Sequence, residues 1–177
     1  MMARWCSYPN FVAGDGGGAG RGVDRYTGRN GTAGRVGPGC AARVTLMFVL
    51  DTNTLIYYFK GMGRVAERLL AQSPREIGIP AVVVYELEVG MAKAMQPEKR
   101  RRQLGEMLAV VAVLPFGTAE ARQAAQIRAA LEGAGTPIGP YDVLIAATAL
   151  ANKGTLVTHN LQEFGRVAGL LVTDWYG

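Results

Sequence analysis

Cysteine, histidine and long hydrophobic runs are scarce in this chain, and each shortage excludes a class of protein. The 177 residues include two cysteines, Cys6 and Cys40, and one histidine, His159. Because both cysteines precede residue 47, the rest of the chain has neither a disulfide framework nor a cysteine-based zinc site, and one histidine argues further against zinc. No apolar run approaches the roughly 20 residues that a membrane-spanning helix needs. We therefore expect a soluble protein of the reducing cytoplasm.

Excess charge is also missing from most of the chain. Residues 1–46 hold six arginines against two aspartates, a net charge of +4, whereas residues 47–177 hold 13 basic against 12 acidic residues, a net charge of +1. A nearly neutral body does not attract nucleic acid by bulk charge. Any contact with nucleic acid must therefore come from a local patch or a bound metal.

Residues 1–46 differ in composition from the rest. They contain 11 of the 24 glycines and show no apolar periodicity. A secretory signal would need an uninterrupted apolar stretch after a basic start, and none is present. We predict a disordered Gly/Arg-rich extension. A further hypothesis is that this segment is a translated upstream region and that the working protein begins at Met47, which mass spectrometry of the native N-terminus would decide.

Residues 47–177 alternate short apolar runs with helical patterns. Alternation of this kind predicts an α/β domain in three layers, with a mostly parallel central sheet flanked by helices. We expect side chains of 52–54 to cap the first helix, Pro80 to occupy the first position of a later one, and Thr118 to cap a third. The expected strands are 47–50, 76–79, 110–114, 155–158 and 170–173, and the expected helices are 52–59, a short one around 65–70, 81–94, one opened by Pro97, 118–133 and 141–151.

Asp51 ends the first strand, which is apolar throughout and so typical of a strand buried on both faces. Ligands of open α/β sheets bind at the carboxyl ends of the strands, which makes Asp51 a candidate functional residue. The same residue can instead serve only as a helix cap in a strand-to-helix turn. The stretch by itself leaves both interpretations open.

Two further carboxylates lie in apolar surroundings. Glu86 interrupts a strongly apolar helix, and Asp142 begins the most apolar helix of the chain. Carboxylates are rarely buried unless they are paired or bound to a metal. Three acids converging at one sheet edge would repel one another, and a divalent cation relieves that repulsion. Oxygen ligands alone favour Mg²⁺ or Mn²⁺, which suits metal-assisted hydrolysis of a phosphodiester.

The order and spacing of four segments resemble the PIN-domain ribonucleases, and more narrowly the VapC toxins of bacterial toxin–antitoxin pairs. The resemblance covers residues 47–177 and none of 1–46. No single motif is specific, but their order and spacing are. The segments are FVLDTN at 48–53, YELEVG at 85–90, PIGPYDVLIAA at 137–147 and LVTHNLQEF at 156–164.

The resemblance implies a role for each matching position. Asp51 and Asp142 would be metal ligands, with Glu86 as the third acid of the site and Mg²⁺ as the cofactor, replaceable by Mn²⁺. Asn160 stands where the family has a fourth acid; it can orient water or substrate but adds no charge. Thr158 matches the hydroxyl that the family has just before that position.

The resemblance also implies partners. The substrate would be RNA, the toxin would form a homodimer, and a cognate antitoxin would insert a C-terminal segment over the acidic pocket. The closing Thr173-Asp174-Trp175 fits the subgroup that cleaves initiator tRNA.

Each candidate also has a simpler interpretation. Asn160 can be a turn residue, His159 a surface residue rather than a base, and Glu88 a solvated neighbour of Glu86, while Glu163 lies close enough in sequence to compensate for Asn160. The basic run 99–102 is either a solvated helix or a contact for the RNA backbone. Two rival functions remain: a PIN domain without catalysis that only binds an antitoxin, and a receiver-type signalling domain, for which the acid pair and the lysine are missing.

Overall fold

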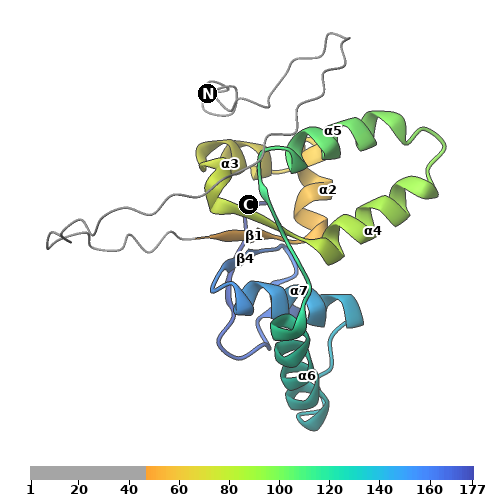
Figure 1. The fold of residues 1–177 in the computed structure, drawn as a ribbon. Helices are drawn as coiled ribbons and strands as arrows, with labels where there is room; N and C mark the ends of the chain where they lie inside the picture. Colours follow the sequence, from red (N-terminus) through yellow and green to blue (C-terminus); the bar gives the residue numbers. More distant parts are fainter. Residues whose placement is uncertain (1–46) are drawn as a thin grey trace, which may run out of the picture. The chain divides into compact units, whose positions relative to one another are not determined.

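The structure is a computed structural model that describes residues 47–177, and these form one five-stranded sheet with helices on both sides (Figure 1). The strand order is β3-β2-β1-β4-β5, and every neighbouring pair is parallel. The predicted α/β class is confirmed, and the described sheet is entirely parallel. The predicted extension of residues 1–46 lies outside the described residues. The strands are β1 (Phe48–Leu50), β2 (Ile77–Pro80), β3 (Ala112–Leu114), β4 (Thr155–Val157) and β5 (Leu171–Thr173).

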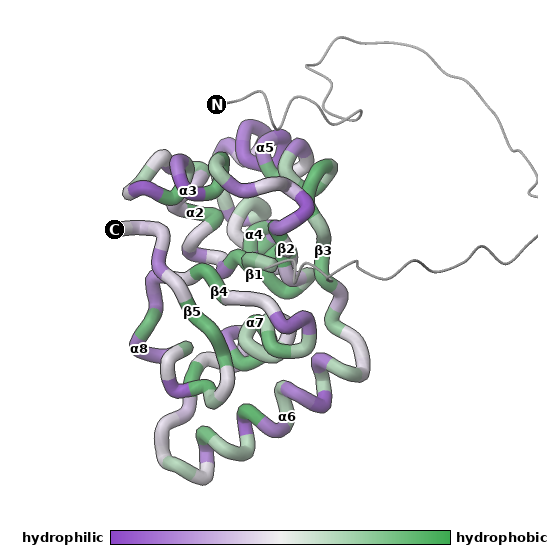
Figure 2. Tube along the Cα trace, turned by 90° about the vertical axis from the view of Figure 1, so that its left-hand side faces the viewer, coloured by the Kyte–Doolittle hydropathy of each residue, from purple (hydrophilic) through white to green (hydrophobic). Residues whose placement is uncertain are grey.

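The helices make up the two outer layers. Helices α2, α3 and α5 lie on one side of the sheet and α6 and α7 on the other, as both ribbon and tube show (Figures 1 and 2). None of the helices in residues 47–177 has the length and apolar character to cross a membrane. The helices are α2 (Thr52–Lys60), α3 (Val65–Ala71), α4 (Ala81–Ala92), α5 (Glu98–Leu108), α6 (Thr118–Gly133), α7 (Pro140–Ala151) and α8 (Leu161–Phe164), with a 3₁₀ turn η1 (Pro74–Glu76).

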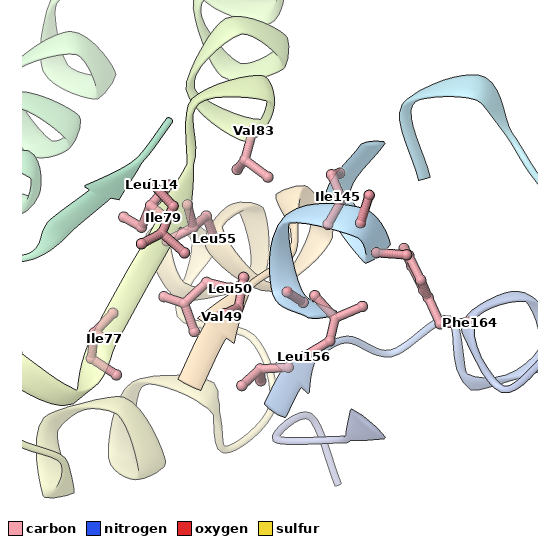
Figure 3. Close-up of a cluster of buried hydrophobic side chains, with 14 of the residues drawn as sticks. Val49, Leu50, Leu55, Ile77, Ile79, Val83, Leu114, Ile145, Leu156 and Phe164 are labelled. Atoms are coloured by element: carbon pink, nitrogen blue, oxygen red, sulfur yellow. The ribbon is translucent and has the colours of Figure 1, made fainter. Parts of the chain in front are cut away.

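The central strands carry the core. Val49 and Leu50 of β1 and Leu156 of β4 have no exposed surface, because helices cover both faces of these strands (Figure 3). Helix α7 adds Ile145, which is also fully buried. Its small neighbours 146–149, three alanines and Thr148, let α7 pack tightly on the sheet and on α6. The two ends of this core, after β1 and at the start of α7, are where the acids predicted from the sequence lie.

The expected helices 52–59, 81–94 and 118–133 begin at the expected residues, but the residues expected to cap or open them are displaced by one position. Asp51, and not a side chain of 52–54, caps α2: its backbone is extended and its carboxylate accepts from the N–H of Thr52. Pro80 ends β2 and precedes α4 instead of opening it. The cap of α6 is Gly117, whose N–H donates to Glu120 at 2.8 Å, so Thr118 is already helical. In each case the N-cap is the residue just before the helix, namely Asp51, Pro80 or Gly117.

Other differences come from short elements. Strand β3 covers only part of the predicted 110–114, because the N–H groups of Val110 and Val111 still bond to Met107 at the end of α5. Helix α8 and the turn η1 were not predicted. Three or four residues are too few to show a helical period, so neither leaves a sequence signal.

Candidate active site

The candidate site lies where the chain leaves β1 and β4. These adjacent strands continue in opposite directions across the sheet, β1 towards β2 and β4 towards β5. Such a switch point opens a crevice at the carboxyl ends of the strands, where α/β folds bind their ligands. Asp51 follows β1 and Thr158 follows β4. The Asp51 N–H donates to the Val157 carbonyl at 3.1 Å, which fixes the two ends side by side.

Asp51 is a buried carboxylate with hydrogen bonds to both oxygens. Thr158 donates its hydroxyl to Oδ2 at 2.9 Å, and the Thr52 N–H donates to Oδ1 at 2.6 Å. Burial raises the pKa of Asp51 from 3.8 to about 6, against the lowering effect of the Thr158 and Thr52 bonds, and the negative charge of Glu86 raises it further. Asp51 is therefore both a helix cap and an acid of the candidate site; the two interpretations do not compete.

Glu86 reaches the site from α4 and is half-buried. Its Oε2 accepts a hydrogen bond from the Thr52 hydroxyl at 2.5 Å. Thr52 thus donates to two acids, through its N–H to Asp51 and through its hydroxyl to Glu86. Thr52 was predicted only as a helix cap, and its link to Glu86 was missed. Glu88 is exposed, as expected of the solvated neighbour.

Asp142 stands in the first turn of α7, as predicted, and is half-buried. Its pKa rises from 3.8 to about 7, first through burial, then through the side chain of Glu163, and further through the charges of Asp51 and Glu86. The close approach of Asp142 to Gly139 leaves no room for a larger residue there: a Cβ on Gly139 would lie 2.9 Å from Oδ2. Because the charges of Asp51 and Glu86 act on Asp142, it belongs to the same anionic cluster as Asp51.

Glu163 is the acid that was expected to be close enough in sequence to compensate for the uncharged Asn160. It lies in α8, and its side chain contacts Asp142 closely enough to raise the Asp142 pKa. Asn160 precedes α8, and its side chain makes no capping hydrogen bond; its N–H donates to the Thr158 hydroxyl at 3.0 Å. Position 160 is thus held close to Thr158, while the fourth negative charge comes from Glu163. Without α8 in view, no sequence signal distinguished the two.

Thr158 connects three parts of the site. It is fully buried, donates to Asp51, accepts from the Asn160 N–H, and donates its own N–H to the Thr173 carbonyl at 2.9 Å. His159, next in the chain, turns away to Asp174, with Nδ1 and Oδ2 2.9 Å apart. His159 is half exposed at the surface, as predicted.

No basic side chain of residues 47–177 forms a salt bridge with Asp51, Glu86 or Asp142. Arg100, the one member of the run 99–102 that turns inward, donates instead to the Phe59 carbonyl at 2.5 Å and to Gln103 at 2.9 Å. Arg101 pairs with Glu98. The acids therefore have hydrogen-bond donors but no salt-bridge partner within the described part of the chain.

These donors fit a hard divalent cation. The carboxylate oxygens of Asp51 and Asp142 are hard donors, and their pKa values are raised first by burial and then by neighbouring negative charge. Mg²⁺ commonly binds one or two carboxylates and keeps several waters. Within residues 47–177, no group of three or more His, Cys, Asp or Glu side chains is placed so that it could hold a metal ion, so a cation here would bind at most two of these side chains and fill its remaining positions with water. The arrangement therefore suits a partly hydrated Mg²⁺ rather than zinc.

Known proteins are similar to this chain in fold and in sequence. The PIN domain family matches residues 48–170. The chain is 37% identical over 131 residues to the tRNA(fMet)-specific endonuclease VapC of Salmonella typhimurium, covering 73% of this chain and 98% of that protein. This chain belongs to the VapC family of PIN-domain ribonuclease toxins. The family membership that the sequence motifs indicated is confirmed.

Other matches agree with the VapC family. Ribonuclease VapC2 of Rickettsia felis is 30% identical over 138 residues, covering 73% of this chain and 98% of that protein. Among solved structures, the DNA-bound VapBC of Salmonella typhimurium matches with a TM-score of 0.69 at 37% identity, covering 73% of this chain and 98% of that one. VapBC2 of Rickettsia felis bound to a promoter DNA fragment matches with a TM-score of 0.67 at 31% identity, covering 73% and 99%.

Proposed function

We propose that this VapC-family toxin is a Mg²⁺-dependent endoribonuclease that hydrolyses initiator tRNA in the cytoplasm. The observation that carries the metal-dependent chemistry is the group of Asp51, Glu86 and Asp142, which influence one another electrostatically at the switch point and have no basic partner among residues 47–177. The names of two relatives support the substrate: tRNA(fMet)-specific endonucleases of Salmonella typhimurium and Shigella flexneri, 37% and 34% identical.

In this proposal the side chains of the candidate site divide between holding the metal, orienting the acids and positioning water or substrate. Asp51 and Asp142 would hold the metal, with Glu86 as the third acid; when bound, Mg²⁺ would supply a water of lowered pKa and offset charge on the phosphate. Thr158 and Thr52 hold the Asp51 carboxylate in one orientation. Asn160 would orient water or substrate beside Thr158.

We further propose an antitoxin as the regulatory partner. Several solved relatives are VapBC complexes, among them DNA-bound VapBC of Salmonella typhimurium and VapBC-1 of nontypeable Haemophilus influenzae, the latter 30% identical with a TM-score of 0.67. An antitoxin that places a cationic side chain among the acids would supply the positive charge that residues 47–177 do not. We also propose a homodimer, which light scattering on the purified toxin would detect.

The test is a cleavage assay with the full chain purified free of antitoxin. We expect Mg²⁺-dependent cuts in total tRNA, concentrated in initiator tRNA when the new RNA ends are sequenced. Cleavage spread over many RNAs would refute the tRNA assignment alone. An absence of any cleavage would favour the rival in which Asn160 marks a PIN domain that only binds its antitoxin.

A further inference from the structure

Two tyrosines form an exposed pair beside the acids. The hydroxyls of Tyr85 and Tyr141 lie 3.4 Å apart, and their ring centroids lie 5.8 Å apart with an interplanar angle of 57°. Tyr85 is 52% exposed and Tyr141 42%. Every other Phe, Tyr and Trp side chain among residues 47–177 is buried or packed at least partly against the core. The pair is therefore not held by the core, and its position needs another explanation.

Both tyrosines are next in sequence to acids of the candidate site. Tyr85 immediately precedes Glu86 in α4, and Tyr141 immediately precedes Asp142 in the first turn of α7. The hydroxyl contact joins the two helices beside the acids. The Tyr85 hydroxyl raises the pKa of Tyr141, and the negative charge of Glu86 adds to that effect, as expected for a ring close to the acidic cluster.

The chemistry of the pair suits an unstacked nucleobase. Proteins that recognise single-stranded RNA stack splayed-out bases on exposed aromatic rings. Rings held by a mutual contact lose little further freedom when a base arrives. A phosphate drawn to a cation held by Asp51 and Asp142 would bring its nearest base towards the rings, because Tyr85 and Tyr141 adjoin Glu86 and Asp142 in the chain. An aromatic surface also adds no charge to a site that already repels anions.

We propose that Tyr85 and Tyr141 form a stacking platform for the nucleobase next to the scissile phosphate. This inference rests on the proposed ribonuclease function and adds a binding subsite to it. Stacking reads the π-face of a base and not its hydrogen-bonding edge, so the platform positions the RNA with little base selectivity. The platform needs a single-stranded nucleotide, which directs the enzyme to loops and away from paired stems.

The experiment compares two double variants of the full chain. Y85A/Y141A removes both rings, whereas Y85F/Y141F removes only the hydroxyl contact. The probe is a fluorescein-labelled 12-nucleotide single-stranded RNA centred on a mapped cut, measured for binding in the non-cleaving Asp51→Asn background and for kcat/KM in the active enzyme. We expect the alanine pair to weaken binding about 5- to 100-fold and the phenylalanine pair to stay within about twofold.

A second arm needs no altered protein. Replacing the nucleotide beside the cut with an abasic one should weaken binding to the unmutated platform and add little in the alanine pair, since both changes remove the same contact. Equal affinity of the alanine pair, or an abasic loss of full size in that pair, overturns the platform. So does a loss confined to antitoxin binding, which would assign the rings to that interface. If the unmutated protein neither binds nor cleaves RNA, both the proposed function and the platform are refuted. If the unmutated protein cleaves RNA and the variants cleave it equally well, only the platform is refuted.

Discussion

The Thr52 hydroxyl donates to Glu86 at 2.5 Å while the N–H of the same residue donates to Asp51, so one threonine joins two acids that are 35 positions apart in sequence. We expect Thr52→Val, which keeps the side-chain shape and loses the hydroxyl, to lower kcat/KM for RNA cleavage at least about tenfold. The reason is that a hydrogen bond to a charged group is worth about 1.5–3 kcal/mol. Thr52→Ser restores the donor and should stay within about threefold; equal activity of the valine variant would show that Glu86 needs no positioning.

Gly139 controls the position of Asp142. A Cβ at residue 139 would lie 2.9 Å from Asp142 Oδ2, so Gly139→Ala must displace the carboxylate. We predict weaker Mg²⁺ binding by calorimetry and about tenfold slower cleavage, with little change in thermal stability, because the displaced atom is the end of a flexible side chain. The control is Gly105→Ala in α5, where the new methyl group meets nothing within 4 Å. A Gly139→Ala variant with unchanged Mg²⁺ affinity would contradict the role of Asp142.

The buried acids should make stability depend on pH in an unusual direction. Since the pKa of Asp51 is raised to about 6 and that of Asp142 to about 7, the folded state holds protons that the unfolded state has released. Without Mg²⁺, the free energy of unfolding should therefore fall as pH rises from about 4 to about 7. For Asp51 the loss is at most about 3 kcal/mol. Asp51→Asn should remove part of this fall and unfold at a higher temperature at pH 7.5.

Addition of Mg²⁺ should reverse the effect in the unmutated protein, because the cation favours the charged carboxylates and displaces their protons. Denaturant titrations from pH 4 to 8, with and without Mg²⁺, measure both changes. Glu88→Gln, an exposed neighbour outside the cluster, is the matched control and should leave the pH profile as it is. A profile of unmutated protein that rises from pH 4 to 7 would show that these acids are not buried together.

Arg100 stabilises the fold through its contacts with Phe59 and is not a free surface cation. Its guanidinium donates to the Phe59 carbonyl near the end of α2 and lies 5.4 Å from the Phe59 ring centre. Arg100→Ala should cost about 1–2 kcal/mol of unfolding free energy, because it leaves that carbonyl without its donor and removes the cation–π contact. Arg102→Ala on the exposed side of the same helix should cost less than about 0.5 kcal/mol by the same denaturant measurement. Equal costs would contradict the assignment.

Much of the site was predictable because its signals are local. An apolar strand that ends in Asp51 and a nearly all-apolar helix that begins at Asp142 each appear within about ten residues, and strand ends of a parallel sheet share one edge. The contacts that organise these acids are not local. The Thr52–Glu86 bond depends on how α2 packs against α4, and the approach of Glu163 to Asp142 depends on a four-residue helix. Neither has a sequence period, so neither was predicted.

The measurement that tests the central claim is cleavage of tRNA by Asp142→Asn beside the unmutated full chain, both free of antitoxin and both with Mg²⁺. The substitution keeps the side-chain size and removes one metal-binding charge from the cluster formed with Asp51 and Glu86. We predict at least about a hundredfold loss of cleavage with no loss of thermal stability. Cleavage by Asp142→Asn at the unmutated rate would contradict the assignment of these carboxylates as the site of a Mg²⁺-dependent ribonuclease.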